Sequence, residues 1–176
     1  GVVVLDDMTT TATNSPLVMD VDFESEGDGT LTVWAGKTVT SNKSDVTITA
    51  WDVVMHGSLT AGTETISVHG SKVLQTIGLG GTGQDMHIES LELQRISATT
   101  GLRIASGVNG SVTVNGIEPS HSSYLSAIAT LVAAQDNSFL TFLTAASTFH
   151  GLHVQADNGI IVKVDITTVT DALYLD

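Results

Sequence analysis

Gly101-Leu102-Arg103-Ile104, with Val112-Thr113-Val114 shortly after it, is a unit that the chain uses twice. It returns as Gly151-Leu152-His153-Val154, followed by Val162-Lys163-Val164. In each of these short segments, which we call bursts, apolar residues stand at every second position. This is the pattern of a strand with one buried face. A β-sandwich has no reason to repeat a two-strand unit, whereas a parallel β-helix rebuilds one cross-section on every coil. The repeat therefore predicts an all-β parallel β-helix with two short strands per coil.

The same in-out-in alternation recurs along the chain, and we expect its apolar members inside. The further bursts are Leu31–Val33, Val46–Ile48, Ile66–Val68, Met86–Ile88, Leu140–Phe142 and Leu173–Leu175. Corners rich in Gly, Asn, Asp and Ser separate them, such as Asp157-Asn158-Gly159. The long interval between Leu102 and Leu140 predicts one further coil near residues 124–132. Residues 124–134 are also the best candidate for a local helix.

The two ends of the chain resemble each other. Residues 1–10 read like residues 159–168, and Leu17-Val18-Met19-Asp20 reads like Leu173-Tyr174-Leu175-Asp176. Self-similarity at a fixed period is the signature of repeat proteins in which each unit packs on its neighbours. We therefore expect residues 1–176 to form a single β-solenoid module, about one cassette of a tandem repeat, without terminal caps. Its partners would be copies of itself, arranged head to tail as a filament or tandem array.

Composition excludes several classes of function. The chain has 41% hydrophobic residues, enough for a packed interior, but only 5% aromatic residues and no cysteine. Its formal net charge of −13 would repel a nucleic-acid backbone or an anionic membrane surface. No apolar run approaches the roughly 20 residues of a membrane-spanning helix. We expect no nucleic-acid partner and no membrane span.

Acidic side chains occupy every second position in one segment, and they form a candidate calcium site. They are Asp20, Asp22, Glu24, Glu26 and Asp28. On a strand all five would face the same way, and calcium prefers clustered oxygen ligands. The EF-hand spacing fails, because Ser25 stands where that loop needs Gly. The alternative is an acidic, solvated edge with Val21 and Phe23 facing inward.

The middle positions of the alternating bursts predict an outward ladder. Its members are Thr32, Thr47, Ser67, His87, Arg103, Thr141, His153 and Tyr174. His87, Arg103, His153 and Tyr174 would form a groove for glycan hydroxyls or for a neighbouring filament. The alternative is a plain solvated face.

Four segments together resemble the repeat region of very large secreted proteins of the filamentous haemagglutinin type. They are Thr76–Gly80, Leu91–Ile96, Gly101–Ile104 and Gly110–Val114, and the resemblance covers residues 31–117 and 151–176. It implies a right-handed β-helix in an extracellular or cell-surface protein used for adhesion, surface coating or fibre building.

The function expected from the sequence is structural or adhesive: a module of a long extracellular fibre, stalk or surface protein that stacks end to end. The alternative is a carbohydrate-binding or carbohydrate-cleaving β-helix. A polysaccharide lyase normally places a basic residue near its acids, and no Lys or Arg lies beside the acidic run. We therefore expect no enzyme activity and no cofactor other than calcium.

Overall fold

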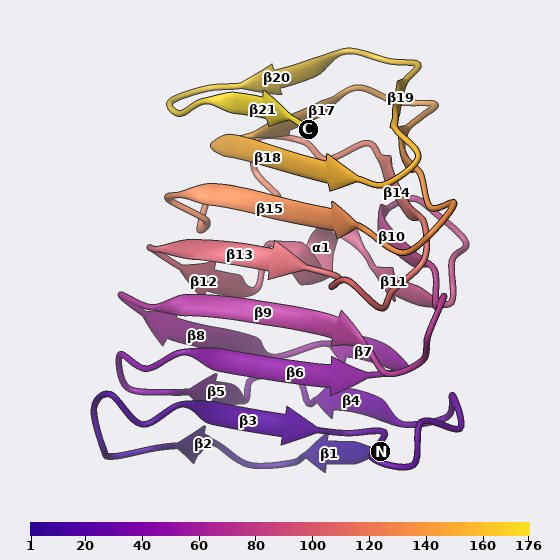
Figure 1. Cartoon of the computed structure of the whole chain (residues 1–176). Helices are drawn as coiled ribbons and strands as arrows, with labels where there is room; N and C mark the ends of the chain where they lie inside the picture. The colour runs from indigo at the N-terminus through magenta and orange to yellow at the C-terminus, as the bar shows by residue number, and fades with distance from the viewer.

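The computed structural model describes all 176 residues, and the chain is all-β apart from one short helix. All strand pairings are parallel. In Figure 1 the strands lie in tiers, with the N-terminus at the bottom and the C-terminus at the top. The expected parallel pairing and the placement of the termini at opposite ends are confirmed.

Five sheets are formed, and the largest, sheet C, has seven strands. Its strands are β3 Leu17–Asp20, β6 Val46–Ala50, β9 Thr65–Gly70, β13 Gly101–Ile104, β15 Ile128–Ala133, β18 Gly151–Ala156 and β21 Leu173–Leu175. Sheet A contains β1 Val2–Val4, β4 Thr30–Val33 and β7 Asp52–Met55. Sheet D contains β10 Ile77–Gly80, β11 Met86–Ile88, β14 Val112–Asn115, β16 Leu140–Phe142 and β19 Ile160–Val162. Sheet B contains β2 Met8–Thr9, β5 Thr38–Thr40, β8 Ser58–Gly62 and β12 Ile96–Ala98, and sheet E pairs β17 Ser147–Phe149 with β20 Ile166–Thr168.

The chain adds one strand to each of three sheets in turn and then returns to the first. We call one such circuit a passage, and a complete passage has three strands instead of the two that the sequence predicts. The first passage runs through β1, β2 and β3, and the last runs through β19, β20 and β21. The strands that the sequence analysis overlooked lie mainly in sheet B, where β2 has two residues and β5 has three. β2 and β5 each contain a single apolar residue, whereas a predicted three-residue strand such as β11 has apolar residues on both sides of a polar one.

The interior is built from apolar columns that follow the register of sheet C. One column contains Leu17, Val46, Ile66, Leu102, Ala129, Leu152 and Leu173. The second contains Met19, Ile48, Val68, Ile104, Leu131, Val154 and Leu175. Apart from Leu17, Leu173 and Leu175, the residues of both columns belong to one core cluster of 37 buried residues. The expected inward positions are thus confirmed except at the C-terminal end of the stack, where Leu173 and Leu175 are exposed.

The passage between β9 and β13 is longer than its neighbours because it contains two adjacent strands, β10 and β11, in sheet D. Val46 and Ile66 pair across a separation of 20 residues, whereas Ile66 and Leu102 pair across 36. The extra length forms β10, a return loop over residues 81–85, and β11, which pairs with β10 in parallel. The loop folds back over Gly78, where an added Cβ would lie only 1.7 Å from the Thr82 hydroxyl. Gly78 is therefore required by this close approach.

Side chains replace a backbone ladder where β7 of sheet A meets β11 of sheet D. The Asp52 Oδ1 accepts the His87 backbone N–H at 3.0 Å, and the Glu92 Oε1 accepts the Met55 N–H at 2.8 Å. Arg95 donates from Nη1 to the Met55 carbonyl at 2.9 Å. Glu92 lies in the short helix α1 Ser90–Leu93, and burial raises the pKa of its carboxyl. We call this junction the seam.

Buried polar side chains satisfy the backbone at the corner that follows sheet C. Asn109 both accepts from the Gly70 N–H at 3.1 Å and donates to the Gly70 carbonyl at 3.0 Å. Gln75 donates to the Trp51 carbonyl at 2.6 Å. These amides link successive passages, because buried backbone groups without partners are costly.

Candidate functional site

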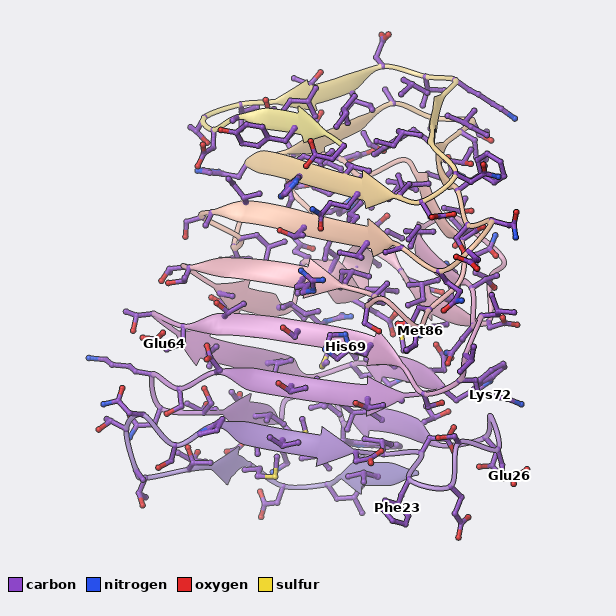
Figure 2. The ribbon with its side chains drawn as sticks, in the orientation of Figure 1. Phe23, Glu26, Glu64, His69, Lys72 and Met86 are labelled. Atoms are coloured by element: carbon purple, nitrogen blue, oxygen red, sulfur yellow. The ribbon has the colours of Figure 1, made fainter.

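The acidic segment does not form one acidic face. Only Asp20 belongs to a strand, and residues 21–28 form an irregular corner. Asp22 is buried, while Phe23 is 83% exposed, the reverse of the expected inward position of Phe23. Figure 2 shows Phe23 and Glu26 projecting away from the sheets. The expectation of five acids on one strand face was wrong because the chain leaves the strand at Asp20.

The Asp22 carboxylate is engaged inside the protein. It accepts hydrogen bonds from the Ser71 hydroxyl at 2.5 Å, from the Gly27 N–H at 3.1 Å and from the Gly29 N–H at 3.2 Å. The Ser71 hydrogen bond, assisted by the backbone amides, lowers the pKa of Asp22. In the whole chain, no group of three or more His, Asp or Glu side chains is placed to hold a metal ion. Asp22 therefore joins the corner after β3 to the corner that follows β9.

The predicted outward ladder is divided among three sheets. Arg103, His153 and Tyr174 do share one outward column of sheet C, together with Thr47, Ser67 and Thr130. Thr32 lies in sheet A, and Thr141 lies in sheet D beside β14. The expectation of a single ladder was wrong because bursts with the same alternation occur in different sheets.

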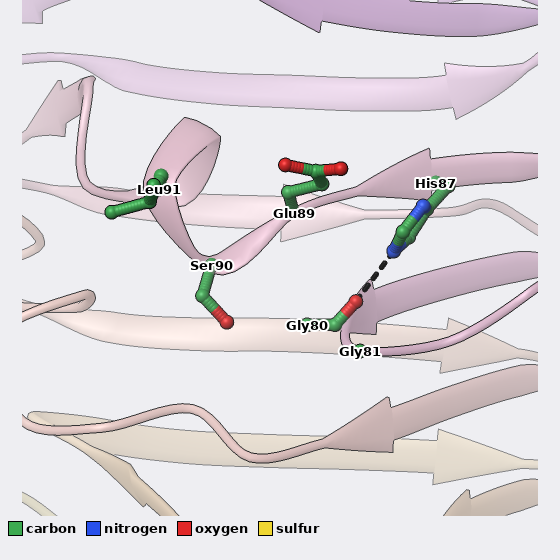
Figure 3. A pocket seen from close by; sticks show the side chains of 6 residues that line it. All are labelled: Gly80, Gly81, His87, Glu89, Ser90 and Leu91. Atoms are coloured by element: carbon green, nitrogen blue, oxygen red, sulfur yellow. Dashed lines mark hydrogen bonds between the residues drawn. The ribbon is translucent and has the colours of Figure 1, made fainter.

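His87, the fourth member of the expected groove, lies in sheet D. It is paired with Gly78, and its Nε2 lies 2.5 Å from the Gly80 carbonyl oxygen. Figure 3 shows this contact at the edge of a hollow of about 230 Å³, with Glu89 and Ser90 on its other side. His87 is therefore used to hold the return loop and does not join Arg103.

The outward column of sheet C includes a compact basic and aromatic group. The His153 Nε2 lies 2.7 Å from the Asp176 Oδ2, and its ring meets Tyr174 edge-on with centroids 5.6 Å apart. A hollow of about 300 Å³ separates Arg103 from His153. Its rim is formed by residues that include Thr65, Thr100 and Thr130.

His69 belongs to this surface, and the sequence analysis missed it. Its Nδ1 lies 3.2 Å from the Ala105 carbonyl oxygen. Burial lowers the pKa of His69, and the nearby positive charge of Arg103 adds to that effect. The signal was present in the alternation Thr65-Ile66-Ser67-Val68-His69, which places His69 on the same face as Ser67.

The last passage leaves the interior columns open, and it forms the first half of the candidate functional site. Leu173 is 41% exposed and Leu175 is 45% exposed, although Leu152 and Val154 directly below them are fully buried. Val162, in the column of Phe142, is 50% exposed. We call Ile160, Val162, Ile166, Leu173 and Leu175 the C-terminal end face.

The first passage presents the equivalent surface at the other end. Val2 belongs to an inward column with Leu31 and Val53. Val2 is 38% exposed, whereas Leu31, the next residue in the column, is fully buried. We call Val2, Val4, Met8, Leu17 and Met19 the N-terminal end face; they begin the inward columns of sheets A, B and C. Each end thus has strands without an outer neighbour. Partly exposed apolar side chains lie there, Val2 at one end and Val162, Leu173 and Leu175 at the other, whereas Val4 and Met19 are already buried.

The matching end sequences occupy matching places in the two end passages. Residues 1–10 contain β1 and β2, and residues 159–168 contain β19 and β20. The second matching pair, Leu17–Asp20 and Leu173–Asp176, contains β3 and β21, both in sheet C. The sequence similarity therefore coincides with the same order of strands at the two ends.

Both end passages contain carboxylates, among them Asp6, Asp7 and Asp20 in the first and Asp165 and Asp176 in the last. Asp6 lies 2.7 Å from Lys37 Nζ, and Asp7 Oδ1 accepts the Thr38 N–H at 2.9 Å. The Lys37 hydrogen bond lowers the pKa of Asp6. By sequence match Asp7 corresponds to Asp165, and Asp20 corresponds to Asp176. Contact between the two ends would bring like charges together, so it would be sensitive to salt.

Comparison with known protein families, curated proteins and solved structures finds no match. The resemblance to filamentous haemagglutinin repeats therefore stays a prediction from sequence. None of the chain's helices has the length and apolar character to cross a membrane.

Proposed function

We propose that the chain is a parallel β-helix module that stacks end to end, with a structural or adhesive role in a long fibre, stalk or surface protein. The observation that carries this proposal is the correspondence of the two end passages. They have similar sequences, the same order of strands and open apolar columns. A passage of the same kind is the partner that each end would accept, in a longer chain or in another copy.

The winding of the chain supports a right-handed β-helix. In Figure 1 the strands of sheet C run from left to right in front, and those of sheets A and B run from right to left behind. The chain climbs from bottom to top during this rotation. A right-handed connection is also the general rule for parallel strands in one sheet.

Strand polarity favours stacking from head to tail. When the N-terminal end face of one copy lies on the C-terminal end face of another, the new strand pairs are parallel, as all pairs within the chain are. The columns of Leu173 and Leu175 then continue into Leu17 and Met19 of the next copy. Full burial of an exposed side chain of this size stabilises by about 1.5–3 kcal/mol, and Leu173 and Leu175, which are already more than half buried, would each contribute a part of that. Such a contact joins two different surfaces and need not close, which is how open filaments form.

The proposed location is extracellular or at the cell surface. Its support is the filamentous haemagglutinin resemblance, together with an interior that has few aromatic residues and repeats from passage to passage. A shaft needs only compatible ends and continuous columns, and the similar end sequences and the continuous columns of sheet C support this proposal.

Sedimentation velocity across a concentration series tests the stacking. We expect the 176-residue chain to form species of increasing size as its concentration rises. Leu175→Asp, which puts a charge on the C-terminal end face, should abolish this growth. Val73→Asp is the matched control, because Val73 is 67% exposed in the corner after β9 and belongs to neither end face. A wild-type chain that stays monomeric throughout, or growth by Leu175→Asp equal to that of wild type, would overturn the proposal.

A further inference from the structure

The side of the stack carries a second surface feature, a polar hollow on the outer face of sheet B. Its volume is about 380 Å³, the largest of the four hollows on the chain and within the size range of small-ligand sites. It is lined by Ser58, Leu59, Thr60, Gln94, Arg95, Ser97 and Tyr124. Hydroxyl, amide and guanidinium groups therefore surround a single aromatic ring.

The register of sheet B brings these groups together from three passages. Thr60 pairs with Ser97, so their hydroxyls lie side by side on the outer face. Leu125 forms an isolated parallel bridge with Ala98, which places the preceding residue, Tyr124, next to Ser97. Tyr124 is 58% exposed, so a ligand can reach its ring.

Arg95 is held in place but keeps most of its donors. Its Nη1 donates to the Met55 carbonyl at 2.9 Å, which fixes the guanidinium beside the hollow. The chain has two ion pairs, Lys37 with Asp6 and His153 with Asp176. Arg95 therefore forms no ion pair with a carboxylate of the protein. The remaining N–H groups are available to acceptors of a ligand.

We propose that this hollow binds a neutral oligosaccharide. An exposed tyrosine ring offers a flat apolar surface to the C–H face of a sugar and a hydroxyl for hydrogen bonding. Ser58, Thr60, Ser97 and Gln94 both donate and accept, as sugar hydroxyls do. The guanidinium of Arg95 adds donors fixed in direction. A neutral ligand is favoured over an acidic one because the chain carries a net charge of −13.

This site goes beyond the proposed stacking and is independent of it. The hollow lies on the outer side of sheet B, so copies that join through their end faces would leave it open. A fibre built from such modules would present one saccharide site per module. Weak binding at each site would then be strengthened by multivalency.

Heteronuclear NMR titration of the 176-residue chain tests the proposal directly. The probes are four neutral trisaccharides, built from β-linked glucose, α-linked glucose, N-acetylglucosamine and mannose, with trigalacturonate as the acidic comparison. We expect at least one neutral probe to shift resonances of residues 58–60, 94–97 and 124, and to bind more tightly than trigalacturonate. Tyr124→Ala should weaken that binding by about tenfold or more.

Two further variants separate loss of the ring from loss of the fold. Tyr124→Phe keeps the ring and should retain most of the affinity. Trp34→Ala removes an exposed aromatic side chain elsewhere and should bind as wild type does. Absence of binding by every neutral probe at about 10 mM would overturn the proposal. So would tighter binding of trigalacturonate, or equal affinity in Tyr124→Ala and wild type.

Discussion

Ile104 lies in the middle of the second interior column, between Val68 and Leu131, and it is fully buried. Replacement by alanine should lower the free energy of unfolding by about 2–5 kcal/mol, because it removes apolar contacts and leaves a cavity. Leu175→Ala is the matched control, since Leu175 belongs to the same column but is 45% exposed. Its cost should be under about 1 kcal/mol. Urea unfolding of the dilute chain measures both, and equal costs would contradict the assignment of the column.

Asp22 makes the stability of the corner depend on pH. Its pKa is lowered in the folded chain, chiefly by the Ser71 hydroxyl, so the ionised form contributes stability above the pKa of the unfolded chain. That contribution is lost as the pH falls through the folded pKa. Ser71→Ala should therefore be less stable than wild type near neutral pH, and the difference should shrink in acid. Thermal unfolding across a pH series measures the difference, and a gap that does not change with pH would contradict this role.

At the scale of elements, the seam between β7 and β11 places a buried carboxyl where strands elsewhere pair through their backbones. Burial raises the pKa of Glu92, so the folded chain holds this proton more tightly than the unfolded chain, and this contribution to stability is lost as the pH rises through the folded pKa. Glu92→Gln has no charge to bury. Its stability relative to wild type should improve from acidic to neutral pH.

Urea unfolding at several pH values measures this trend for Glu92→Gln. Glu24→Gln is the control, because Glu24 is exposed in the corner after β3. The control should show no such trend relative to wild type. A relative stability of Glu92→Gln that falls toward neutral pH would show that the charged form of Glu92 is the favoured one.

The strands of sheet C could be predicted from the sequence, because their alternation is regular. The additional coil expected near residues 124–132 is confirmed by β15, while the helix considered there was wrong, since β15 spans Ile128–Ala133. The position of the second strand in the repeated unit was also wrong, because β19 spans Ile160–Val162 and not Val162–Val164. Ile160, not Val162, shares the column position of Val112. Alternation predicts which face of the sheet a side chain lies on. It does not fix the register between strands, because a shift of two residues leaves every side chain on the same face.

The remaining features depend on contacts between distant residues. Helix α1 has four residues, and it lies where Glu92 and Arg95 reach Met55, a contact that no local pattern encodes. Arg103, His153 and Tyr174 share one column because all three lie in sheet C. His87 does not share it, and alternation does not tell which sheet a strand joins. The hollow on the outer face of sheet B could not be predicted either, because its lining residues come from three passages and no local pattern shows that they meet.

For the whole molecule, the charge of −13 and the acids at both ends predict that stacking depends on salt. Asp7 would approach Asp165 of another copy, and Asp20 would approach Asp176. Added sodium chloride should therefore strengthen self-association by screening this repulsion, as sedimentation velocity would show. Weaker association at higher salt would contradict the proposed contact.

Calcium provides a separate comparison. At matched ionic strength we expect calcium and sodium to have equal effects on the melting temperature, because the acidic side chains do not gather into a metal site. A rise in the melting temperature specific to calcium, reversed by a chelator, would support the calcium hypothesis for Asp20, Asp22, Glu24, Glu26 and Asp28.

Mixing two variants that are blocked at opposite ends tests the head-to-tail contact most directly. Val2→Asp blocks the N-terminal end face, and Leu175→Asp blocks the C-terminal end face. Each variant alone should remain monomeric in sedimentation velocity, because a head-to-tail contact needs both faces. An equimolar mixture should form a heterodimer and grow no further, since each variant keeps one complementary face. Dimers of either variant alone, or a mixture that stays monomeric where wild type associates, would contradict the account.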